Sequence, residues 1–419
     1  MQVFELDYVI DYARTHCPYY REKYKDLPPR PALPDLPLVD VADYWSAARK
    51  SFDNVLTNKI TSGKILQSGG TTGKPKFAVY SNEEWRTVNL LTAMHLPESG
   101  LRNGDILMNG FASGSLYASY DAVTIMHHYC PKPFVLLNIG LNAPLNEWAN
   151  AAVRHQATLI ASVPSRLMQF FEYVAREKVA GLALDGVYFA GEILTMQQRE
   201  YINMVMGRQL SYRSMGYAGN DTGNVGYFAE DCGYNEHRVL SSAYVLEIID
   251  PQSGRPIIEE GRVGTVYVTA LYRLQMPNIR YPVGDMAMYT EPPGRADRKF
   301  ILIGRNEQSI RVSSLTLNLS DIEDILEDMG VNYQNYQIVV SNENMLNQLL
   351  IRVVSTDGRT EEFVQELGRQ RPLLAELVED GRIHPIKVRW CDAAGLEYNP
   401  TTGKANKVLD KRLQKTGEQ

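Results

Sequence analysis

Short apolar segments alternate with helical segments between residues 106 and 206, and this alternation constrains the fold more than any other feature of the chain. The pattern predicts strands at 106–111, 134–139, 158–162 and 186–190, and helices at 121–129, 145–156, 165–178 and 195–206. Strands separated by helices of about 12 residues are typical of a parallel sheet with helical crossovers. We therefore expect an α/β fold here.

The flanking segments follow different patterns. Residues 3–25 predict a helix that breaks near Pro18 and restarts, 27–38 an extended proline-rich connector, and 40–50 a helix capped by Asp40. Segments 239–250 and 264–270, with a turn at 251–254, indicate a β-rich subdomain. From Phe300 onward the pattern favours a helix at 320–329, strands at 335–341, 348–355 and 383–390, and a helix at 360–379. We expect a large N-terminal domain at 1–303 and a small, mobile α+β domain at 304–419.

The bulk composition excludes several classes of protein. A chain of 419 residues suggests two or three domains, and a net charge of -6 argues against a general nucleic-acid or anionic-membrane binder. The four cysteines are scattered without a CxxC pair, which predicts neither a disulfide framework nor a zinc cluster. The first residues lack an apolar signal region, and no apolar run approaches the roughly 18 residues of a membrane span. A cytoplasmic protein is expected.

A glycine-rich stretch carries the first chemical signal: Gln67-Ser-Gly-Gly-Thr-Thr-Gly-Lys-Pro-Lys76. Apolar residues on both sides predict a loop between two strands. Glycines let backbone N–H groups point at one centre, so together with hydroxyls and lysines the loop suits an anion such as a nucleotide phosphate. It is not a Walker A loop, because Pro75 follows Lys74 where that motif needs Ser or Thr. A plain Gly/Thr hairpin is the alternative.

Four further stretches are each ambiguous when taken alone. Asp221 follows Met215-Gly-Tyr-Ala-Gly-Asn, where it is either a Mg²⁺ ligand beside a triphosphate or a turn aspartate. Asp285 follows Gly284 and is either an acceptor for ribose hydroxyls or part of a turn. Arg305 suits phosphate or ribose contact, and Lys404 offers a positive charge in a terminal loop; each has a solvated surface side chain as its alternative.

The order and spacing of these stretches resemble the adenylate-forming superfamily of acyl-CoA ligases, peptide-synthetase adenylation domains and luciferases. The chain is most similar to the phenylacetate–CoA ligase group, over nearly its whole length. Further matching stretches are Cys17-Pro-Tyr-Tyr-Arg21, Pro164-Ser165, Gly191-Glu192, Cys232 with His237, Glu247–Gly254 and Gly403–Arg412. The resemblance implies ATP and Mg²⁺ as cofactors, with CoA as an acceptor left open.

The resemblance also implies a role for each matching residue. The ATP phosphates would be wrapped by Ser68, Gly69, Gly70, Thr71, Thr72, Gly73 and Lys76. Gly191 and Glu192 would lie near the adenine, Tyr217 would stack on it, and Asp285 would hold the ribose, with Arg305 as a further nucleotide contact. Asp221 would ligate Mg²⁺, Glu307 would be the hinge, and Lys404 would be the catalytic lysine.

The acid would bind near a hydroxyl-rich segment that borders the substrate in the relatives. Tyr117, Tyr120 and Gly216 are the expected contacts, and the two tyrosines favour an aryl or heteroaryl acid. Core packing is the alternative for both tyrosines. Cys232 with His237 is a candidate half of a metal site, but ordinary packing is the stronger interpretation because two further ligands are missing nearby.

Several positions depart from the pattern of the relatives. Gly69 replaces a hydroxyl residue, Asp221 a longer glutamate, and Pro282-Val283 an Arg-Thr pair. Glu307 replaces the usual hinge residue, and Ser313-Ser314 stands where the group has Arg-Gly on the loop that lines the pantetheine tunnel. A Cβ there crowds the approach to the backbone.

Two functional hypotheses follow. In the first, the chain adenylates a carboxylic acid and passes the acyl group to CoA, a carrier-protein thiol or an amine. In the second, the chain is a degenerate relative that binds nucleotide or acid without full turnover. No nucleic acid or membrane partner is expected, and analogy with the relatives leaves a homodimer open.

Overall fold

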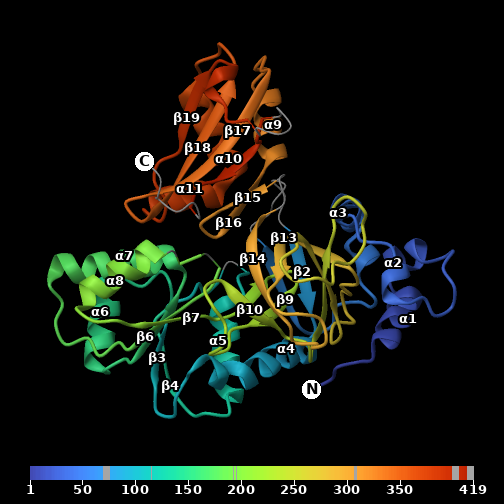
Figure 1. Ribbon diagram of the computed structural model, residues 1–419, viewed down its shortest axis with the longest axis horizontal. Coiled ribbons are helices and arrows are strands. Elements are labelled where there is room, and N and C mark those ends of the chain that lie inside the picture. The colour runs from blue at the N-terminus through green and yellow to red at the C-terminus, as the bar shows by residue number, and fades with distance from the viewer. Residues whose placement is uncertain are drawn as a thin grey trace.

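The computed structural model describes residues 1–419 except 69–75, 115, 192, 195, 306–308, 399–404 and 413–419. For Ser68, Gln197, Gly304, Arg305, Ser309 and Ala393 only the backbone is described. Two sheets lie side by side in the N-terminal part of the chain, and the C-terminal part forms a separate unit against them (Figure 1). Within the described ranges, every helix is too short or too polar to cross a bilayer.

A five-stranded parallel sheet in the order β4-β3-β5-β6-β7 confirms the predicted α/β fold. Its strands are β3 (Ile106–Asn109), β4 (Val135–Asn138), β5 (Leu159–Ser162), β6 (Gly186–Phe189) and β7 (Ser211–Ser214). The accompanying helices are α5 (Ser119–Tyr129), α6 (Leu145–Arg154), α7 (Pro164–Glu177) and α8 (Met196–Met206). The central strands β5 and β6 are buried throughout, as expected for strands covered on both faces.

The predicted β-rich subdomain is a seven-stranded antiparallel sheet in the order β11-β12-β13-β14-β10-β9-β8. Its strands are β8 (Tyr217–Gly219), β9 (Gly223–Tyr227), β10 (Glu236–Val239), β11 (Tyr244–Ile249), β12 (Gly264–Ala270), β13 (Tyr281–Tyr289) and β14 (Lys299–Arg305). The prediction of one β segment over 239–250 was wrong. Val239 ends β10 and a turn closed by Ala243 N–H donating to Leu240 O (2.9 Å) precedes β11.

The N-terminal helices and the two strands that flank the glycine-rich stretch pack along this second sheet. The helices are α1 (Leu6–His16), α2 (Pro18–Lys23), α3 (Val41–Lys50) and α4 (Asn82–His95), with 3-10 turns η1 (Leu33–Asp35), η2 (Phe52–Val55) and η3 (Leu96–Ser99). The predicted Asp40 cap is confirmed, because its side chain accepts from Asp43 N–H at 2.9 Å. The hairpin of β1 (Lys64–Ser68) and β2 (Lys76–Tyr80) confirms the predicted loop between strands.

The C-terminal unit combines a hairpin, a small sheet and helices. Its strands are β15 (Ser309–Val312), β16 (Leu315–Asn318), β17 (Asn335–Glu343), β18 (Leu346–Val354), β19 (Lys387–Cys391) and β20 (Val408–Asp410). Its helices are α9 (Leu319–Asp328), α10 (Thr360–Gln370), α11 (Pro372–Glu379) and the 3-10 turn η4 (Ala393–Gly395). Strands β19-β18-β17-β20 form one sheet over an apolar core drawn from residues 310–383. The predicted boundary between residues 303 and 304 falls inside β14, which pairs with β13 up to Arg305, and the separate apolar core begins at Ile310.

One predicted helix of this unit is corrected by the structure. Residues 360–379 form two helices, α10 and α11, and not one. Pro372 has no backbone N–H and disfavours a helical conformation for the residue before it, so Arg371 adopts φ -129° and the chain turns between the helices.

Candidate active site

The carboxyl ends of two parallel strands bring two predicted segments together. Strand β6 leads to Gly191 and β7 leads to Gly216 and Tyr217, and these two strands pair in parallel. Met215 N–H donates to Phe189 O at 2.8 Å, which keeps the two segments adjacent beyond the strands. Ligands of open α/β sheets bind in the crevice outside the carboxyl ends of the strands. Gly191 and Gly216 therefore lie where a ligand is expected.

Gly216 occupies a position that only glycine fits. Its φ is +127°, and a Cβ would come within 2.5 Å of Gly226 O and 2.6 Å of Asn224 Oδ1. Its N–H donates to Ser214 Oγ at 3.1 Å, and Ser214 Oγ is also 2.8 Å from His237 Nε2. The turn before Tyr217 is thus held by sterics and by a buried hydroxyl.

His237 is a structural residue of this turn. It is buried, and burial lowers the pKa of His237 to about 4, so the imidazole is neutral at pH 7. Cys232 Sγ accepts from Ala229 N–H at 3.5 Å, and Cys232 is buried in an apolar core cluster. Among the described residues no three His, Cys, Asp or Glu side chains group as a metal site. The packing interpretation of this pair is supported.

Tyr217 and Asp285 meet in the interior of the site. Tyr217 Oη donates to Asp285 Oδ2 at 2.7 Å, and both side chains are buried. Asp285 lies within strand β13 rather than in the turn that was its alternative, and it pairs with Arg305 of β14. The backbone therefore places Arg305 next to Asp285, while the aromatic ring of Tyr217 reaches Asp285 from β8, the edge strand of the same sheet.

Asp221 lies in the turn between β8 and β9. Its Oδ2 accepts from Tyr281 Oη at 3.0 Å. Its backbone carbonyl accepts from Asn278 Nδ2 at 2.9 Å and from the Arg273 guanidinium. Arg273 is fully buried and lies 4.2 Å from the centre of the Tyr80 ring. The carboxylate of Asp221 is therefore presented on a turn whose backbone is fixed from behind.

The β1–β2 hairpin is tied to this turn. Asn220 Nδ2 donates to Gln67 O at 2.6 Å, and Tyr80 Oη donates to Asn220 O at 3.1 Å. Gln67 lies next to the glycine-rich loop, because Ser68 pairs with Lys76 where the hairpin enters the loop, whereas Tyr80 pairs with Lys64 at the other end of the hairpin. The turn that carries Asp221 therefore contacts both strands of the hairpin, and on β1 it does so next to the loop.

The two tyrosines of the predicted acid pocket differ in their surroundings. Tyr117 follows Leu116, whose carbonyl accepts from Gln67 N–H at 3.0 Å, so this segment borders the glycine hairpin. Burial raises the pKa of Tyr117, while the charges of Arg382 and Arg311 act in the opposite direction. Tyr120 is half-buried and packs on the apolar cluster that contains Phe111. The core-packing alternative therefore applies to Tyr120.

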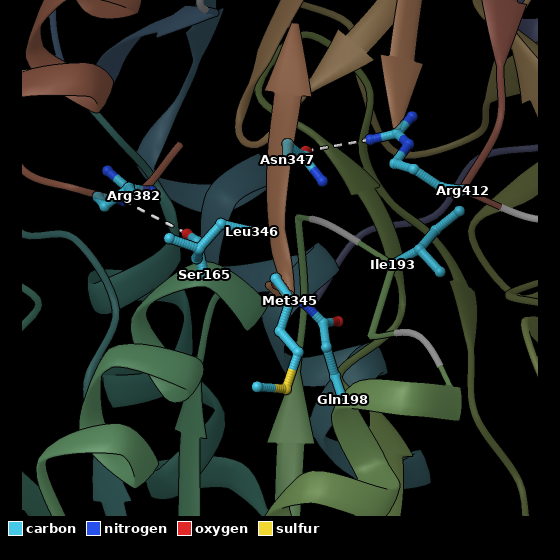
Figure 2. A pocket seen from close by; sticks show the side chains of 8 residues that line it. All are labelled: Ser165, Ile193, Gln198, Met345, Leu346, Asn347, Arg382 and Arg412. Carbon is cyan, nitrogen blue, oxygen red and sulfur yellow. Dashed lines mark hydrogen bonds between the residues drawn. The ribbon is translucent and has the colours of Figure 1, made fainter. Parts of the chain in front are cut away.

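The C-terminal unit approaches the same edge of the parallel sheet. Gln198 Nε2 of α8 donates to Met345 O at 2.6 Å, and Gln169 Nε2 of α7 donates to Asp380 O at 2.8 Å. A small cavity of about 10 Å³ lies between the two units (Figure 2). Its lining residues are Ser165, Ile193, Gln198, Met345, Leu346, Asn347, Arg382 and Arg412.

The hairpin turn at Ser313-Ser314 lies beside this cavity. Ser313 Oγ is 3.5 Å from Ser165 Oγ, and Arg382 donates to Ser165 Oγ at 3.4 Å (Figure 2). Arg382 also donates to Ser314 Oγ at 3.5 Å. Ser313 has φ +53°, a left-handed conformation that favours glycine, and it is buried. The residue with the glycine-like backbone is therefore Ser313, whereas the relatives have their glycine at the position of Ser314.

Some predicted site residues fall outside the described part of the chain. These are Gly69, Gly70, Thr71, Thr72, Gly73, Glu192, Glu307 and Lys404. The side chains of Ser68 and Arg305 are also not described. Three residues that sequence reasoning missed are Trp45, Arg273 and Tyr281. Tyr281 stands directly before Pro282-Val283 in the stretch that leads to Asp285, but only its tertiary contact with Asp221 gives it a part in the site.

Comparisons with known proteins agree with this geometry. Residues 319–412 match the family model of the AMP-binding enzyme C-terminal domain. The chain is 22% identical to a phenylacetate-coenzyme A ligase of Thermus thermophilus, over 98% of this chain and 96% of the relative. The fold matches a crystal structure of 2-hydroxyisobutyryl-CoA ligase with 2-HIB-AMP and CoA in the thioesterification state. That match has a TM-score of 0.74 and 20% identity, and covers 97% of this chain and 88% of the other.

The same ligase in its postadenylation state, in complex with 2-HIB-AMP, matches less closely. The TM-score is 0.63 at 20% identity, over 97% of this chain and 88% of the other. Both matches cover the same shares of the two chains, so the difference in TM-score reflects a different arrangement of the ligase in its two states and not a different set of residues compared. Family model, curated relative and fold together confirm the resemblance that the motifs predict: residues 319–412 match the AMP-binding C-terminal domain, and the whole chain is similar to phenylacetate-coenzyme A ligases and has the fold of an acyl-CoA ligase.

Proposed function

We propose that this protein is an ATP-dependent ligase that converts a carboxylic acid to an acyl-adenylate with release of pyrophosphate, and then transfers the acyl group to CoA. The observation that carries the proposal is that Tyr217, Asp221 and Asp285 lie together with the β1–β2 hairpin that leads into the glycine-rich loop. The β1–β2 hairpin, the β8–β9 hairpin and β13 are far apart in the sequence, and these hydrogen bonds bring them together. The curated relative and the CoA-bound structure are ligases of this kind.

The described residues fit a nucleotide. Asp285 offers a buried carboxylate for the two ribose hydroxyls, and the ring of Tyr217 beside it offers an aromatic face for the adenine. The glycine-rich loop is proposed to cover the phosphates, and the hydrogen bond from Asn220 to Gln67, just before the loop, supports this proposal. Gly191, Glu192 and Arg305 are proposed as further contacts to the nucleotide.

The described residues also fit Mg²⁺. This cation is usually held by one or two carboxylates together with phosphate oxygens, and Asp221 supplies one carboxylate on a rigid turn next to the glycine hairpin. When bound, Mg²⁺ would offset the negative charge of the triphosphate. No other acidic ligand is required of the protein.

The chemistry of the first step explains the residue types. The attacking carboxylate is already ionised at pH 7, so no general base is needed. Attack at the α-phosphorus accumulates negative charge, which Lys404 and Lys76 are proposed to stabilise. The role of this chain is to align the acid with the α-phosphate and to hold the leaving pyrophosphate under the glycine loop.

The arrangement of the C-terminal unit supports the second step. The chain matches the CoA-bound thioesterification state better than the postadenylation state of the same ligase. In this arrangement the Ser313-Ser314 turn faces Ser165 at the edge of the parallel sheet. Ser313 is buried and has a left-handed backbone, and a Cβ on this turn crowds the approach of the CoA pantetheine to the backbone. A carrier-protein thiol or an amine is therefore the alternative acceptor to CoA.

We propose an aryl or heteroaryl acid as the substrate. The supporting observation is Tyr117, which lies next to the glycine hairpin and within the influence of Arg382 and Arg311. Tyr120, in the first turn of α5, packs on the apolar cluster that contains Phe111, and we propose that it contributes to the shape of the pocket. Gly216 is proposed to let the acid approach the backbone closely.

The test is mass spectrometry of the acyl-adenylate formed from a panel of aromatic and aliphatic acids with ATP and Mg²⁺, together with ATP–pyrophosphate exchange. We expect exchange with aryl acids, and a thioester when CoA is added. ATP binding without exchange for any acid would instead support a degenerate relative that binds without turnover. Adenylate without thioester would point to an amine or a carrier protein as acceptor.

Lys404→Ala tests the catalytic assignment. The variant should lose about 100-fold or more in exchange rate, because one charge that stabilises the transition state is removed. Its affinity for ATP should stay close to that of the wild type. Lys387→Ala, which removes an exposed lysine of the same unit, is the matched control. An unchanged exchange rate in Lys404→Ala would disprove the assignment.

A further inference from the structure

A bridge of two aromatic side chains joins Lys76, at the end of the glycine-rich loop, to the carboxylate of Asp221. Lys76 Nζ lies 5.8 Å from the centre of the Trp45 ring. Trp45 Nε1 donates to Tyr281 Oη at 3.2 Å, and Tyr281 Oη donates to Asp221 Oδ2 at 3.0 Å. We call Trp45 and Tyr281 the aromatic bridge. It links two groups that the proposed function assigns to the phosphates of ATP, Lys76 directly and Asp221 through Mg²⁺.

The direction of the hydrogen bonds in the aromatic bridge is fixed by chemistry. An indole N–H can only donate, so Tyr281 Oη must accept from Trp45. The single proton of the phenol is then available for Asp221 Oδ2, which accepts as a carboxylate. This arrangement holds one oxygen of Asp221 and fixes the direction in which the other oxygen points.

The aromatic bridge is held rigidly by its surroundings. Trp45 and Tyr281 are buried, and Tyr44 packs edge-on against both, with ring centroids 5.4 and 5.6 Å away. Trp45 and Tyr44 belong to α3, which lies far from Asp221 in sequence. A shell of this kind fixes the rotamer of a ligand side chain. This matters for an aspartate, whose side chain is one methylene shorter than the glutamate of the relatives.

We propose that Trp45 and Tyr281 are positioning residues that orient the Asp221 carboxylate toward the cation of the nucleotide complex, and that Trp45 at the same time supports Lys76. This inference rests on the proposed function, because it assumes that Asp221 faces the Mg²⁺ of bound ATP. It adds a role for α3 and for the first residue of β13 that no motif indicates.

The test is isothermal titration of ATP in excess Mg²⁺ and of ATP in EDTA. Tyr281→Phe removes the hydroxyl and keeps the ring, so the Kd for the Mg²⁺ complex should rise about tenfold, while the Kd for ATP in EDTA stays within about twofold. Trp45→Phe keeps an aromatic face under Lys76 but removes the N–H, so it should act in the same direction more weakly. Trp45→Leu also removes the aromatic ring under Lys76, so it should raise the Kd for ATP in EDTA as well.

Two controls separate this role from general destabilisation. Tyr289→Phe removes a buried hydroxyl from the same strand, where Tyr289 Oη donates to Leu246 O at 3.1 Å, and should change neither Kd. In an Asp221→Ala background, Tyr281→Phe should have no further effect on the Mg²⁺ complex, because its acceptor is absent.

The outcomes distinguish failure of the bridge from failure of the function. If Tyr281→Phe and Trp45→Phe behave like Tyr289→Phe while Asp221→Ala still lowers affinity for the Mg²⁺ complex, the positioning role is wrong and the proposed function stands. If the wild type binds ATP equally with and without Mg²⁺, or not at all, the proposed function fails and the positioning role with it.

Discussion

At the scale of single residues, the site depends on polar groups that are each held by one or two specific partners. Asp285 is bonded by Tyr217 and Ser214 by His237 in the interior, and the half-buried Asp221 is bonded by Tyr281. A buried hydrogen bond of this kind stabilises the fold modestly when made, and leaving one partner unsatisfied is costly. Substitutions at these residues should therefore have specific effects on ligand binding or on pH dependence.

Asp285→Asn should weaken ATP binding about tenfold or more, because hydrogen bonds to a charged group contribute roughly 1.5–3 kcal/mol. The measurement is the Kd for ATP and for its 2′- and 3′-deoxy analogues. The wild type should discriminate against the deoxy analogues, and the variant should lose much of that discrimination. Unchanged discrimination in Asp285→Asn would show that the carboxylate does not hold the ribose.

His237 should make stability fall in mildly acidic solution. Burial lowers its pKa in the folded state to about 4, below the ordinary value near 6.5, so the unfolded chain binds the proton more readily. The stabilisation is complete above pH 6.5 and is lost as the pH falls toward 4, by up to about 3 kcal/mol. Thermal unfolding of His237→Gln should lose less stability over this range than the wild type. His128→Gln, at an exposed histidine, should follow the wild type.

At the scale of elements, local sequence patterns predicted most helices and strands, and the misses have physical causes. Strand β13 contains Pro282 and Gly284, which predicted a turn, but pairing with β12 and β14 on both sides outweighs these local preferences. Helix 360–379 was predicted whole because its apolar spacing continues past Pro372, while the missing N–H breaks it. The short hairpins β8–β9 and β15–β16 have too few residues to show a period of two.

Gly216→Ala tests the β8–β9 element. A Cβ at this position would meet the backbone of Gly226 within 2.5 Å, in addition to the strain of φ +127°. We expect a loss of stability of about 3 kcal/mol, together with weaker ATP binding because Tyr217 shifts. Gly254→Ala is the matched control, since its φ is +67° and nothing lies within 4 Å. It should lose only about 1 kcal/mol. Equal losses in the two variants would argue against a steric role for Gly216.

At the scale of the whole molecule, the proposed reaction requires two arrangements of the C-terminal unit, and the structure has one of them. Across the boundary Gln169, Gln198 and Ser165 make polar contacts, and Met345 and Leu346 pack against the apolar cluster of the parallel-sheet part. Interfaces of this kind resemble transient interfaces between proteins, and relative motion is the expectation for them. The C-terminal unit should therefore exchange positions between the two steps.

Gln169→Ala tests this exchange. The side chain donates to Asp380 O at 2.8 Å across the boundary, so its loss should disfavour the observed arrangement. Thioester formation with CoA should slow by about two- to tenfold, as expected for one neutral hydrogen bond. ATP–pyrophosphate exchange should be unchanged or faster. Gln252→Ala, at an exposed glutamine of the β-rich subdomain, is the control. Equal slowing of both steps would contradict the model of exchange.

The sequence by itself determined the class of fold and the order of the chemical motifs, because the period of apolar residues and the residues of turns and loops are local properties. The tertiary structure alone decided which motifs meet. Tyr217 reaches Asp285 across 68 residues, and Trp45 reaches Tyr281 across 236. Contacts at such separations depend on how sheets stack and on which side chains face one another, and no local preference encodes them. For that reason Asp221 was predictable as a candidate ligand, while the aromatic bridge that orients it was not.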